Sequence, residues 1–378
     1  MHKFGSLSIN CTFGKLFVNT PLTKVYIQDK TIIMKRKLIF LFILFSTTII
    51  LAQKKDTIRI AAVGDIMMGT AFPSEKYLPP KGKNPFEGVL DELQSADLLF
   101  GNLEGCISDT GKNAKHCKDP DKCYSFRMPS YLAEYLNTAG FDLVSIANNH
   151  IGDFGRTGIE NTKKNLDRYQ IKYAGVYGNE TAVFEKDSIT YGFCAFAPNR
   201  DTVKLTDIDN AVEIVKSLAE QADIVIVSFH GGAEGDKHTH VTRKTETFYG
   251  ENRGNVYAFA HAVIDAGADI VLGHGPHVPR AIEIYKDKFI AYSLGNFCTY
   301  GRFSLSGSKG YAPIVKISVD NQGNFIEGKV VSARQTKTEC PHIDANASAF
   351  KMIRTLTGQD FPEVPVVFEE NGRFYLKK

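Results

Sequence analysis

Six short apolar segments of this 378-residue chain are each followed directly by side chains that can bind a metal ion. In chain order, the apolar segments are 58–63, 98–100, 143–147, 224–229, 270–272 and 289–294. The residues that follow them are, in the same order, Gly64-Asp65, Gly101-Asn102-Leu103-Glu104, Asn148-Asn149-His150, His230, Gly273-His274-Gly275-Pro276-His277 and Gly295-Asn296. We predict these segments to be strands, and open α/β sheets bind their ligands beyond the carboxyl ends of their strands. Carboxylate, carboxamide and imidazole groups should therefore meet at one edge of a sheet.

Taken one at a time, these residues have ordinary structural explanations. An Asp or Asn after a strand commonly caps a turn, and His230 alone is as readily a hydrogen-bonded core histidine. The order and spacing of the whole set favour a metal site instead. Oxygen and imidazole ligands suit Mn²⁺, Fe or Zn²⁺ better than Ca²⁺. The absence of an obvious thiolate ligand argues against a structural zinc site. One or two divalent ions are expected, and a pair of ions can activate a bridging water as a nucleophile.

The elements between these motifs predict a mixed α/β domain. The predicted strands, which include 193–197, are short apolar runs. Such runs are typical of strands in a sheet that is covered on both faces. Residues 156–169, 207–221 and 255–266 show helical spacing, and 314–319 with 325–331 form a predicted antiparallel hairpin around a turn at 321–323. We predict one domain over 56–335 and a C-terminal extension over 336–378, because no linker rich in Gly, Ser or Pro separates the motifs.

The N-terminal region resembles an export signal. Lys35, Arg36 and Lys37 precede an apolar run over 38–51, and Ala52 offers a small cleavage residue. The run is short for a membrane span, and no cysteine follows it as a lipoprotein would require. We expect residues 34–52 to be a signal peptide and 1–33 to come from an upstream start site, so that the protein touches the membrane only during export to the periplasm or cell surface.

Charge and cysteine content agree with this interpretation. Removal of residues 1–52 leaves 38 basic and 41 acidic residues, and no basic stripe indicates a nucleic-acid partner. An even number of cysteines remains, as in many exported proteins. We predict a disulfide between Cys117 and Cys123, with a zinc site that includes His116 as the alternative, and a buried free thiol at Cys194.

Six ordered motifs resemble those of the CapA family, the poly-gamma-glutamate capsule synthesis proteins within the calcineurin-like metallophosphatase superfamily. They are Gly64-Asp65-Ile66-Met67, Gly101-Asn102-Leu103-Glu104, Ala147-Asn148-Asn149-His150 with Asp153, Phe229-His230-Gly231-Gly232, Gly273-His274-Gly275-Pro276-His277 and Ser293-Leu294-Gly295-Asn296-Phe297. The resemblance covers about residues 58–335. It implies a four-layer α/β/β/α sandwich of the metallophosphatase type.

The resemblance also implies roles for individual residues. Asp65, Glu104, Asn149, His230, His274 and His277 would hold the metal, and His150 would be the catalytic acid or the electrostatic partner of the leaving group. Three departures from the superfamily pattern weaken the expectation of two tightly held metals, and the first of them leaves the first metal short of a ligand. Met67 stands where a ligand histidine is common, Glu104 replaces the usual bridging aspartate, and the closing histidines are spaced as His-Gly-Pro-His.

Two further residues are expected near the substrate, Arg253 and Asn296. Arg253 could clamp a carboxylate or phosphate, or form a structural salt bridge to Glu251 or Glu246. Two functions follow. The first is an exported metal-dependent hydrolase that acts on a phosphoester, or on an amide, of an envelope polymer. The second is a non-catalytic capsule factor that binds an anionic polymer such as poly-gamma-glutamate and assists its synthesis, export or tethering.

Overall fold

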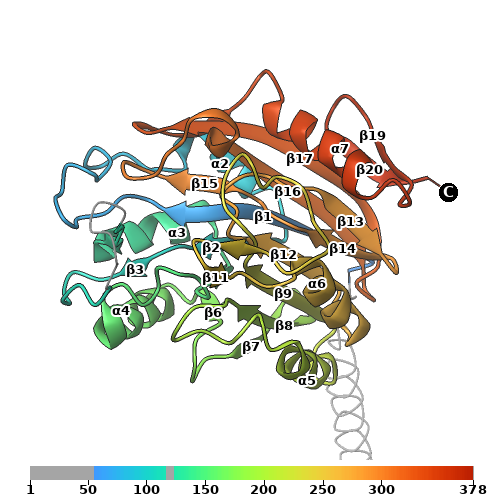
Figure 1. Cartoon of the computed structure of the whole chain (residues 1–378), viewed down its shortest axis with the longest axis horizontal. Helices are drawn as coiled ribbons and strands as arrows, with labels where there is room; N and C mark the ends of the chain where they lie inside the picture. The colour runs from blue at the N-terminus through green and yellow to red at the C-terminus, as the bar shows by residue number, and fades with distance from the viewer. Residues whose placement is uncertain (1–54, 116–122, 378) are drawn as a thin grey trace, which may run out of the picture. The chain divides into compact units, whose positions relative to one another are not determined.

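The computed structural model describes residues 55–115 and 123–377 (Figure 1). The predicted upstream segment 1–33 and signal peptide 34–52 lie outside these residues. Cys117, the predicted disulfide partner of Cys123, also lies outside the described residues. Cys123 itself is disulfide-bonded. Cys194 is a buried free thiol, as predicted. Within the described ranges, no helix is long and apolar enough to cross a membrane.

The larger of two main sheets has ten strands. Its main path, in spatial order, is β19 (Val366–Phe368), β20 (Arg373–Leu376), β17 (Phe325–Thr336), β16 (Tyr311–Asp320), β1 (Thr57–Met67), β2 (Leu98–Leu103), β5 (Leu143–Ser145) and β6 (Lys172–Ala174). Off this path, β15 (Asn296–Thr299) pairs with β1 and β18 (Glu339–Ile343) pairs with β17. Strands β1, β2, β5 and β6 run parallel, so their carboxyl ends meet at one edge. The predicted hairpin is present as β16 and β17.

The smaller main sheet has six strands. They are, in spatial order, β13 (Ile282–Tyr285), β14 (Lys288–Ala291), β12 (Ile270–His274), β9 (Ile224–His230), β8 (Ile189–Phe196) and β7 (Thr181–Lys186). The four central strands are parallel, and the two outer strands are antiparallel to their neighbours. Two short ribbons complete the strands, β3 (Cys106–Ile107) with β4 (Arg127–Met128) and β10 (Thr247–Phe248) with β11 (Glu251–Asn252).

Six α-helices and three 3-10 turns are described. The helices are α2 (Leu90–Leu93), α3 (Ala133–Ala139), α4 (Gly155–Arg168), α5 (Ile208–Ala219), α6 (Val256–Asp265) and α7 (Ser348–Asp360), and the turns are η1 (Glu87–Val89), η3 (Ser130–Leu132) and η4 (Gly307–Gly310). The predicted helices 156–169, 207–221 and 255–266 correspond to α4, α5 and α6. Helices α5 and α6 begin with N-caps, because the Asp207 side chain accepts a hydrogen bond from the Asn210 amide and the Asn255 side chain accepts one from the Ala258 amide.

Three hydrophobic cores separate the layers. One lies between the two main sheets and includes Ile60 of β1 and Ile226 of β9. A second packs the outer face of the larger sheet against α3, and a third packs the outer face of the smaller sheet against α5 and α6. This is the predicted four-layer α/β/β/α sandwich. Every residue of β9 is buried, which explains why its sequence is an almost unbroken apolar run.

The C-terminal segment 336–378 adds to the same sandwich. Strands β18 and β20 both pair with β17. Helix α7 places Phe350 and Ile353 in the core between the sheets, and Phe374 of β20 joins them there. The described part of this segment is therefore continuous with the larger sheet, although the sequence set it apart as an extension.

Candidate metal centre and cleft

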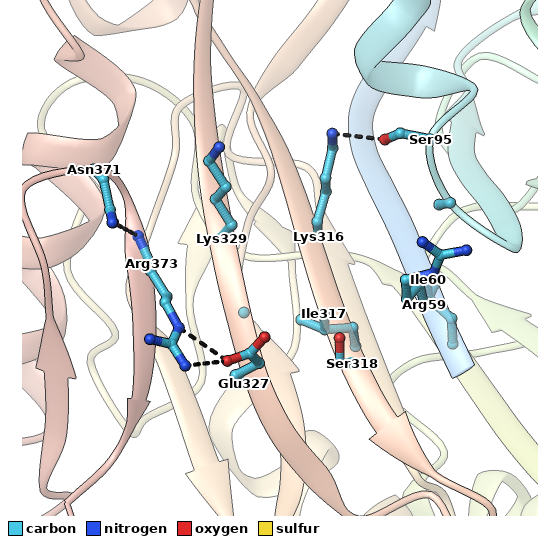
Figure 2. Close-up of a pocket in the computed structure, with 12 residues that line it drawn as sticks. Arg59, Ile60, Ser95, Lys316, Ile317, Ser318, Glu327, Lys329, Asn371 and Arg373 are labelled. Carbon is cyan, nitrogen blue, oxygen red and sulfur yellow. Dashed lines mark hydrogen bonds and ion pairs between the residues drawn. The ribbon is translucent and has the colours of Figure 1, made fainter. Parts of the chain in front are cut away.

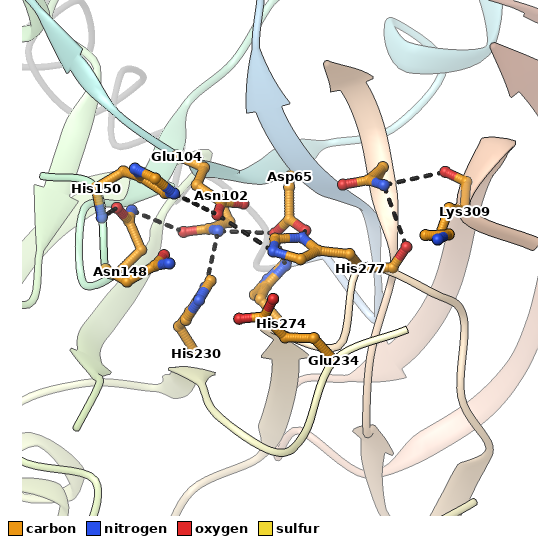
Figure 3. A network of polar contacts seen from close by, with 12 residues as sticks. Asp65, Asn102, Glu104, Asn148, His150, His230, Glu234, His274, His277 and Lys309 are labelled. Atoms are coloured by element: carbon orange, nitrogen blue, oxygen red, sulfur yellow. Dashed lines mark hydrogen bonds and ion pairs between the residues drawn. The ribbon is translucent and has the colours of Figure 1, made fainter. Parts of the chain in front are cut away.

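The two main sheets bring their parallel strand ends to one place. In the larger sheet, the register aligns Asp65 at the end of β1 with Asn102 of β2. In the smaller sheet, His230 of β9 lies beside His274 of β12. Figure 3 shows these four side chains converging from the two sheets. The loop that precedes β15 packs closely against β1 at Gly64. A side chain cannot fit there, since a Cβ on Gly64 would lie 1.9 Å from a backbone oxygen of that loop.

The convergent residues form a buried carboxylate and histidine cluster. Asp65, Glu104 and His230 each offer a ligand atom, and these atoms all lie within 4.8 Å of one another. Nδ1 of His274 lies 3.4 Å from Oδ1 of Asp65, and Nδ1 of His277 lies 2.9 Å from Oδ2 of Asp65. Nε2 of His277 is also 3.6 Å from Oε1 of Glu104. The structure thus brings together five of the six residues predicted as metal ligands.

The sixth predicted ligand, Asn149, lines the wall of the adjoining cleft. Its Oδ1 atom is buried and has no hydrogen-bond partner among the described residues. A buried amide oxygen without a partner is unfavourable, so this atom is available to a ligand. The assignment of Asn149 as a metal ligand stays a prediction.

Several ligand atoms of the cluster also lack partners within the described ranges. Both carboxylate oxygens of Glu104, both ring nitrogens of His274 and Nε2 of His230 are buried without a hydrogen bond. Burying charged or polar groups in this way costs several kcal/mol per group unless they bind a cation or each other. A divalent cation fits this donor set of oxygen and imidazole nitrogen atoms.

Burial and charge strongly perturb the titration of the cluster. Burial raises the pKa of Glu104 well above its usual value. Burial alone would also raise the pKa of Asp65, but the ion-pair contacts with His274 and His277 outweigh it and hold that pKa far below its usual range. Burial opposes the charge of His277, yet Glu104 and Asp65 raise the pKa of this imidazole to about 10. Without a cation, Glu104 and His277 therefore tend to hold protons, and a divalent cation that displaces these protons would compensate the two carboxylates.

His150 lies beside the cluster in a fixed orientation. Its Nδ1 atom is 2.7 Å from Oδ2 of Asp153, and that oxygen also accepts a hydrogen bond from the Phe126 amide at 2.8 Å. Its Nε2 atom is 3.9 Å from Oε1 of Glu104. Burial lowers the pKa of His150, and the nearby charge of Lys115 lowers it further. Asp153 thus turns Nε2 of His150 toward the cluster.

Two residues of the site were missed as functional residues by sequence reasoning. Asn102 donates a hydrogen bond from Nδ2 to Oδ1 of Asp65 at 2.8 Å, and the same Nδ2 lies 3.5 Å from Nδ1 of His230. Lys115 places Nζ 3.1 Å from Nδ1 of His150 and 3.0 Å from Oδ1 of Asp153. Asn102 could have been found from its place in the Gly-Asn-Leu-Glu motif, whereas no local pattern marks Lys115.

Met67 does not reach the site. It is fully buried in the core between the larger sheet and its helices. Met67 therefore offers no ligand to the carboxylate and histidine cluster.

The two predicted substrate residues both line the cleft. Nη1 of Arg253 lies 3.0 Å from Glu234 and 3.9 Å from Glu251. The other predicted partner, Glu246, pairs with Arg280. Asn296 uses its Nδ2 to donate hydrogen bonds to the backbone oxygens of His277, at 3.1 Å, and Lys309, at 3.0 Å.

The cleft over the cluster has a volume of about 600 Å³. Phe126 and Phe303 stack in its wall with ring centroids 4.9 Å apart, and they contact the rings of His150 and His277, respectively. Lys115, Arg302 and Lys309 add positive charge to its lining. The cleft is therefore wide enough for a polymer segment or a phosphoester, with aromatic walls and cations beside the cluster.

A second hollow of about 350 Å³ lies on the larger sheet, at β1, β16, β17 and β20 (Figure 2). Its cations mostly have partners: Lys316 bonds to Glu92 and Ser95, and Arg373 bonds to Glu327. It contains no carboxylate and histidine cluster among the described residues. The candidate chemistry therefore lies in the first cleft.

Comparison with known proteins identifies the family. The sequence model described as "Bacterial capsule synthesis protein PGA_cap" matches residues 59–300, which is more than half of the chain. The chain belongs to the bacterial capsule synthesis protein family. Together with two relatives named CapA, this match confirms the resemblance to the CapA family.

Two relatives named CapA illustrate the similarity. The PGA biosynthesis protein CapA of Bacillus subtilis (strain 168) is 30% identical over 259 residues, which cover 64% of this chain and 63% of that protein. The capsule biosynthesis protein CapA of Bacillus anthracis is 28% identical over 268 residues, covering 65% of this chain and 60% of that protein. The chain thus spans less than two thirds of the length of these two relatives.

Among solved structures, a putative 5'-nucleotidase from Staphylococcus aureus in complex with alpha-ketoglutarate has a TM-score of 0.42 and 18% identity to this family member. The similarity covers 82% of this chain and 59% of that chain.

Proposed function

We propose that this protein is an exported, metal-dependent hydrolase of a capsule or envelope polymer, with a phosphoester as the first candidate bond and an amide as the second. The supporting observation is the buried group of unpaired ligand atoms on Glu104, His230 and His274, which adjoins His150 and His277 in the lining of a cleft of about 600 Å³. Charged and polar groups buried without partners are retained where they bind something.

The metal would be held by side chains from both sheets. We assign this role to Asp65, Glu104, Asn149, His230, His274 and His277, with one or two ions of Mn, Fe or Zn. When bound, such an ion polarises the bond to be cleaved and lowers the pKa of a bound water toward neutrality.

The protein's own residues supply orientation and proton transfer. Asp153 accepts a hydrogen bond from Nδ1 of His150, so that Nε2 faces the cleft; when the imidazole is protonated on both nitrogens, it can give its Nε2 proton to the leaving oxygen or nitrogen. Phe126 packs on the imidazole ring with centroids 4.2 Å apart and limits its rotation. Lys115 neutralises Asp153 and can contact the negative charge that develops on the substrate.

The cellular setting follows from the family and the leader. The relatives named for PGA and capsule biosynthesis support an anionic capsule polymer, or a phosphoester formed with it, as the substrate. The predicted signal peptide over 34–52 supports export to the periplasm or cell surface. The second candidate function, a non-catalytic factor for polymer synthesis, export or tethering, is favoured by the loss of a histidine at Met67.

The test combines metal content with hydrolysis. Purified protein should contain Mn, Fe or Zn in stoichiometric amounts, and His230→Ala should lose it, whereas the exposed control His240→Ala should not. His150→Ala should keep its metal but hydrolyse phosphomonoesters, phosphodiesters or γ-glutamyl amides about 10²- to 10⁴-fold more slowly than the parent. Metal-loaded parent protein that cleaves none of these substrates but binds polyglutamate would support the non-catalytic function instead.

A further inference from the structure

Arg253 is a buried cation whose hydrogen bonds are incomplete. Its side chain is 2% exposed, and its Nη1 atom lies 3.0 Å from Glu234. Its Nε and Nη2 atoms are buried and have no hydrogen-bond partner among the described residues. A guanidinium with two unpaired buried donors is costly, because its charge has left water without full compensation.

Arg280 shows how this protein satisfies a buried guanidinium that has only a structural role. It is 1% exposed, and all three of its nitrogens donate hydrogen bonds. Two of these nitrogens bond to Glu246, and further bonds reach the backbone oxygens of His238 and Ala233. Arg253 differs from Arg280 in lacking partners on one whole edge.

The position of Arg253 points to a role in the cleft. It lines the same cleft as His150 and His277. Its backbone oxygen accepts a hydrogen bond from the Gly232 amide at 2.9 Å, which ties it to the segment just after His230.

The unpaired donors have a defined chemical preference. Nε and Nη2 lie on one edge of the planar guanidinium and donate two nearly parallel hydrogen bonds, a geometry that matches two oxygens of a carboxylate or phosphate. Glu234 holds Nη1 on the opposite edge and so fixes the plane of the group.

We propose that Arg253 is the oxyanion-binding residue of the cleft, and that it takes a phosphate or carboxylate group of the substrate on its Nε and Nη2 edge. This proposal rests on the proposed function, which places the reacting bond at the neighbouring cluster. It names the substrate class: the substrate carries an oxyanion within reach of the metal centre.

The test measures anion binding separately from hydrolysis. Orthophosphate and a short γ-glutamyl oligomer are each titrated calorimetrically into the parent protein, Arg253→Lys and Arg200→Lys, with and without metal. Arg253→Lys keeps the positive charge beside Glu234 but loses the two-donor edge. Arg200 is a matched control, because its side chain is 80% exposed and contacts only Asp201 among the described ion pairs.

We expect Arg253→Lys to bind the relevant anion about ten- to a hundredfold more weakly, with unchanged metal content, and Arg200→Lys to match the parent. Weakening for phosphate alone assigns the edge to a phosphoester, weakening for the oligomer alone assigns it to a carboxylate, and weakening for both assigns the shared oxyanion chemistry. Unchanged affinity for both anions in folded Arg253→Lys overturns the proposal.

A second variant guards against a folding failure of Arg253→Lys. Glu234→Gln keeps a hydrogen-bond acceptor for Nη1 but removes the negative charge beside the guanidinium, so anions should bind more tightly than to the parent. Unchanged or weaker binding to Glu234→Gln would contradict the proposal. Failure of the proposed function would appear differently, as absence of hydrolysis by a metal-loaded parent whose anion binding still depends on Arg253.

Discussion

Replacement of Arg280 by methionine should destabilise the protein more than any surface charge change. Arg280 and Glu246 form a two-pronged ion pair, with Nη1 2.9 Å from Oε1 and Nη2 2.8 Å from Oε2. Their side chains are 0% and 5% exposed. The pair fixes the segment after β9, because Oε2 of Glu246 also accepts a hydrogen bond from the Ala233 amide and Nε of Arg280 donates one to the backbone oxygen of His238.

The expected loss follows from what the substitution leaves behind. Arg280→Met removes four hydrogen bonds and leaves the Glu246 carboxylate buried without its cation. Loss of one partner of a buried ion pair costs about 3–5 kcal/mol. Arg280→Met/Glu246→Met should recover part of this loss, since no buried charge remains unpaired, but the backbone groups of Ala233 and His238 still lack partners.

Equilibrium unfolding in urea with saturating metal measures these free energies. Arg354→Met is the control, because Arg354 pairs with Glu370 at side-chain exposures of 37% and 85%, and such pairs contribute less than about 1 kcal/mol. A loss below about 1 kcal/mol for Arg280→Met would refute the assumption that the pair is desolvated. A double variant that is less stable than either single variant would refute the claim that the unpaired carboxylate is the main cost.

Two further predictions concern other parts of the fold. Burial opposes the charge of Asp97, but hydrogen bonds from Arg59 lower the pKa of Asp97 to about 2. The pKa of Asp97 in the unfolded chain is about 4, so its pair with Arg59 contributes its full stability above about pH 4 and loses it as the pH falls through about 2. This contribution is at most about 2 kcal/mol after allowance for the exposure of Arg59. The free energies of unfolding of Asp97→Asn and the parent in urea should therefore differ at about pH 7 and converge near about pH 2. Gly64→Ala should lose about 3 kcal/mol or more and its metal, because the new Cβ would lie 1.9 Å from the Gly295 oxygen. Gly358→Ala, in open space on α7, should gain about 0.5 to 1 kcal/mol, and equal thermal stability of these two alanine variants would contradict the packing argument.

The main features of the fold were predictable because they depend on local patterns. The apolar run of β9 and the helical spacing of α5 each specify an element and the face that it buries. The C-terminal elements were missed even though α7 buries Ala349, Phe350, Ile353 and Leu356 at helical spacing. Its start is hard to recognise, because the residue before it, Ala347, is left-handed and offers no side-chain cap, while the Asp344 side chain accepts the hydrogen bond from the Ser348 amide.

The candidate site was predictable in composition but only partly in arrangement. Strand ends placed Asp65, His230 and His274 at one edge, and the structure brings them together. The sequence could not show that Glu246 pairs with Arg280, or that the nearest carboxylate to Arg253 belongs to Glu234 and a more distant one to Glu251. The Glu246–Arg280 pair joins the loops after β9 and β12, whereas Arg253 and Glu234 are brought together by the folding of the loop after β9 alone.

The metal cluster depends on the core between the sheets, because each sheet supplies only part of it. Asp65 comes from the larger sheet and His274 from the smaller, and the His274 ring packs on Phe100 of β2 with centroids 5.6 Å apart. A change in the spacing of the sheets would therefore move the imidazole relative to the carboxylate. Interiors are close-packed and transmit such shifts, so a core substitution such as Phe100→Ala should alter the ligand geometry as well as the stability. The packing between the buried faces of β2 and β12 therefore helps to position the side chains of the site.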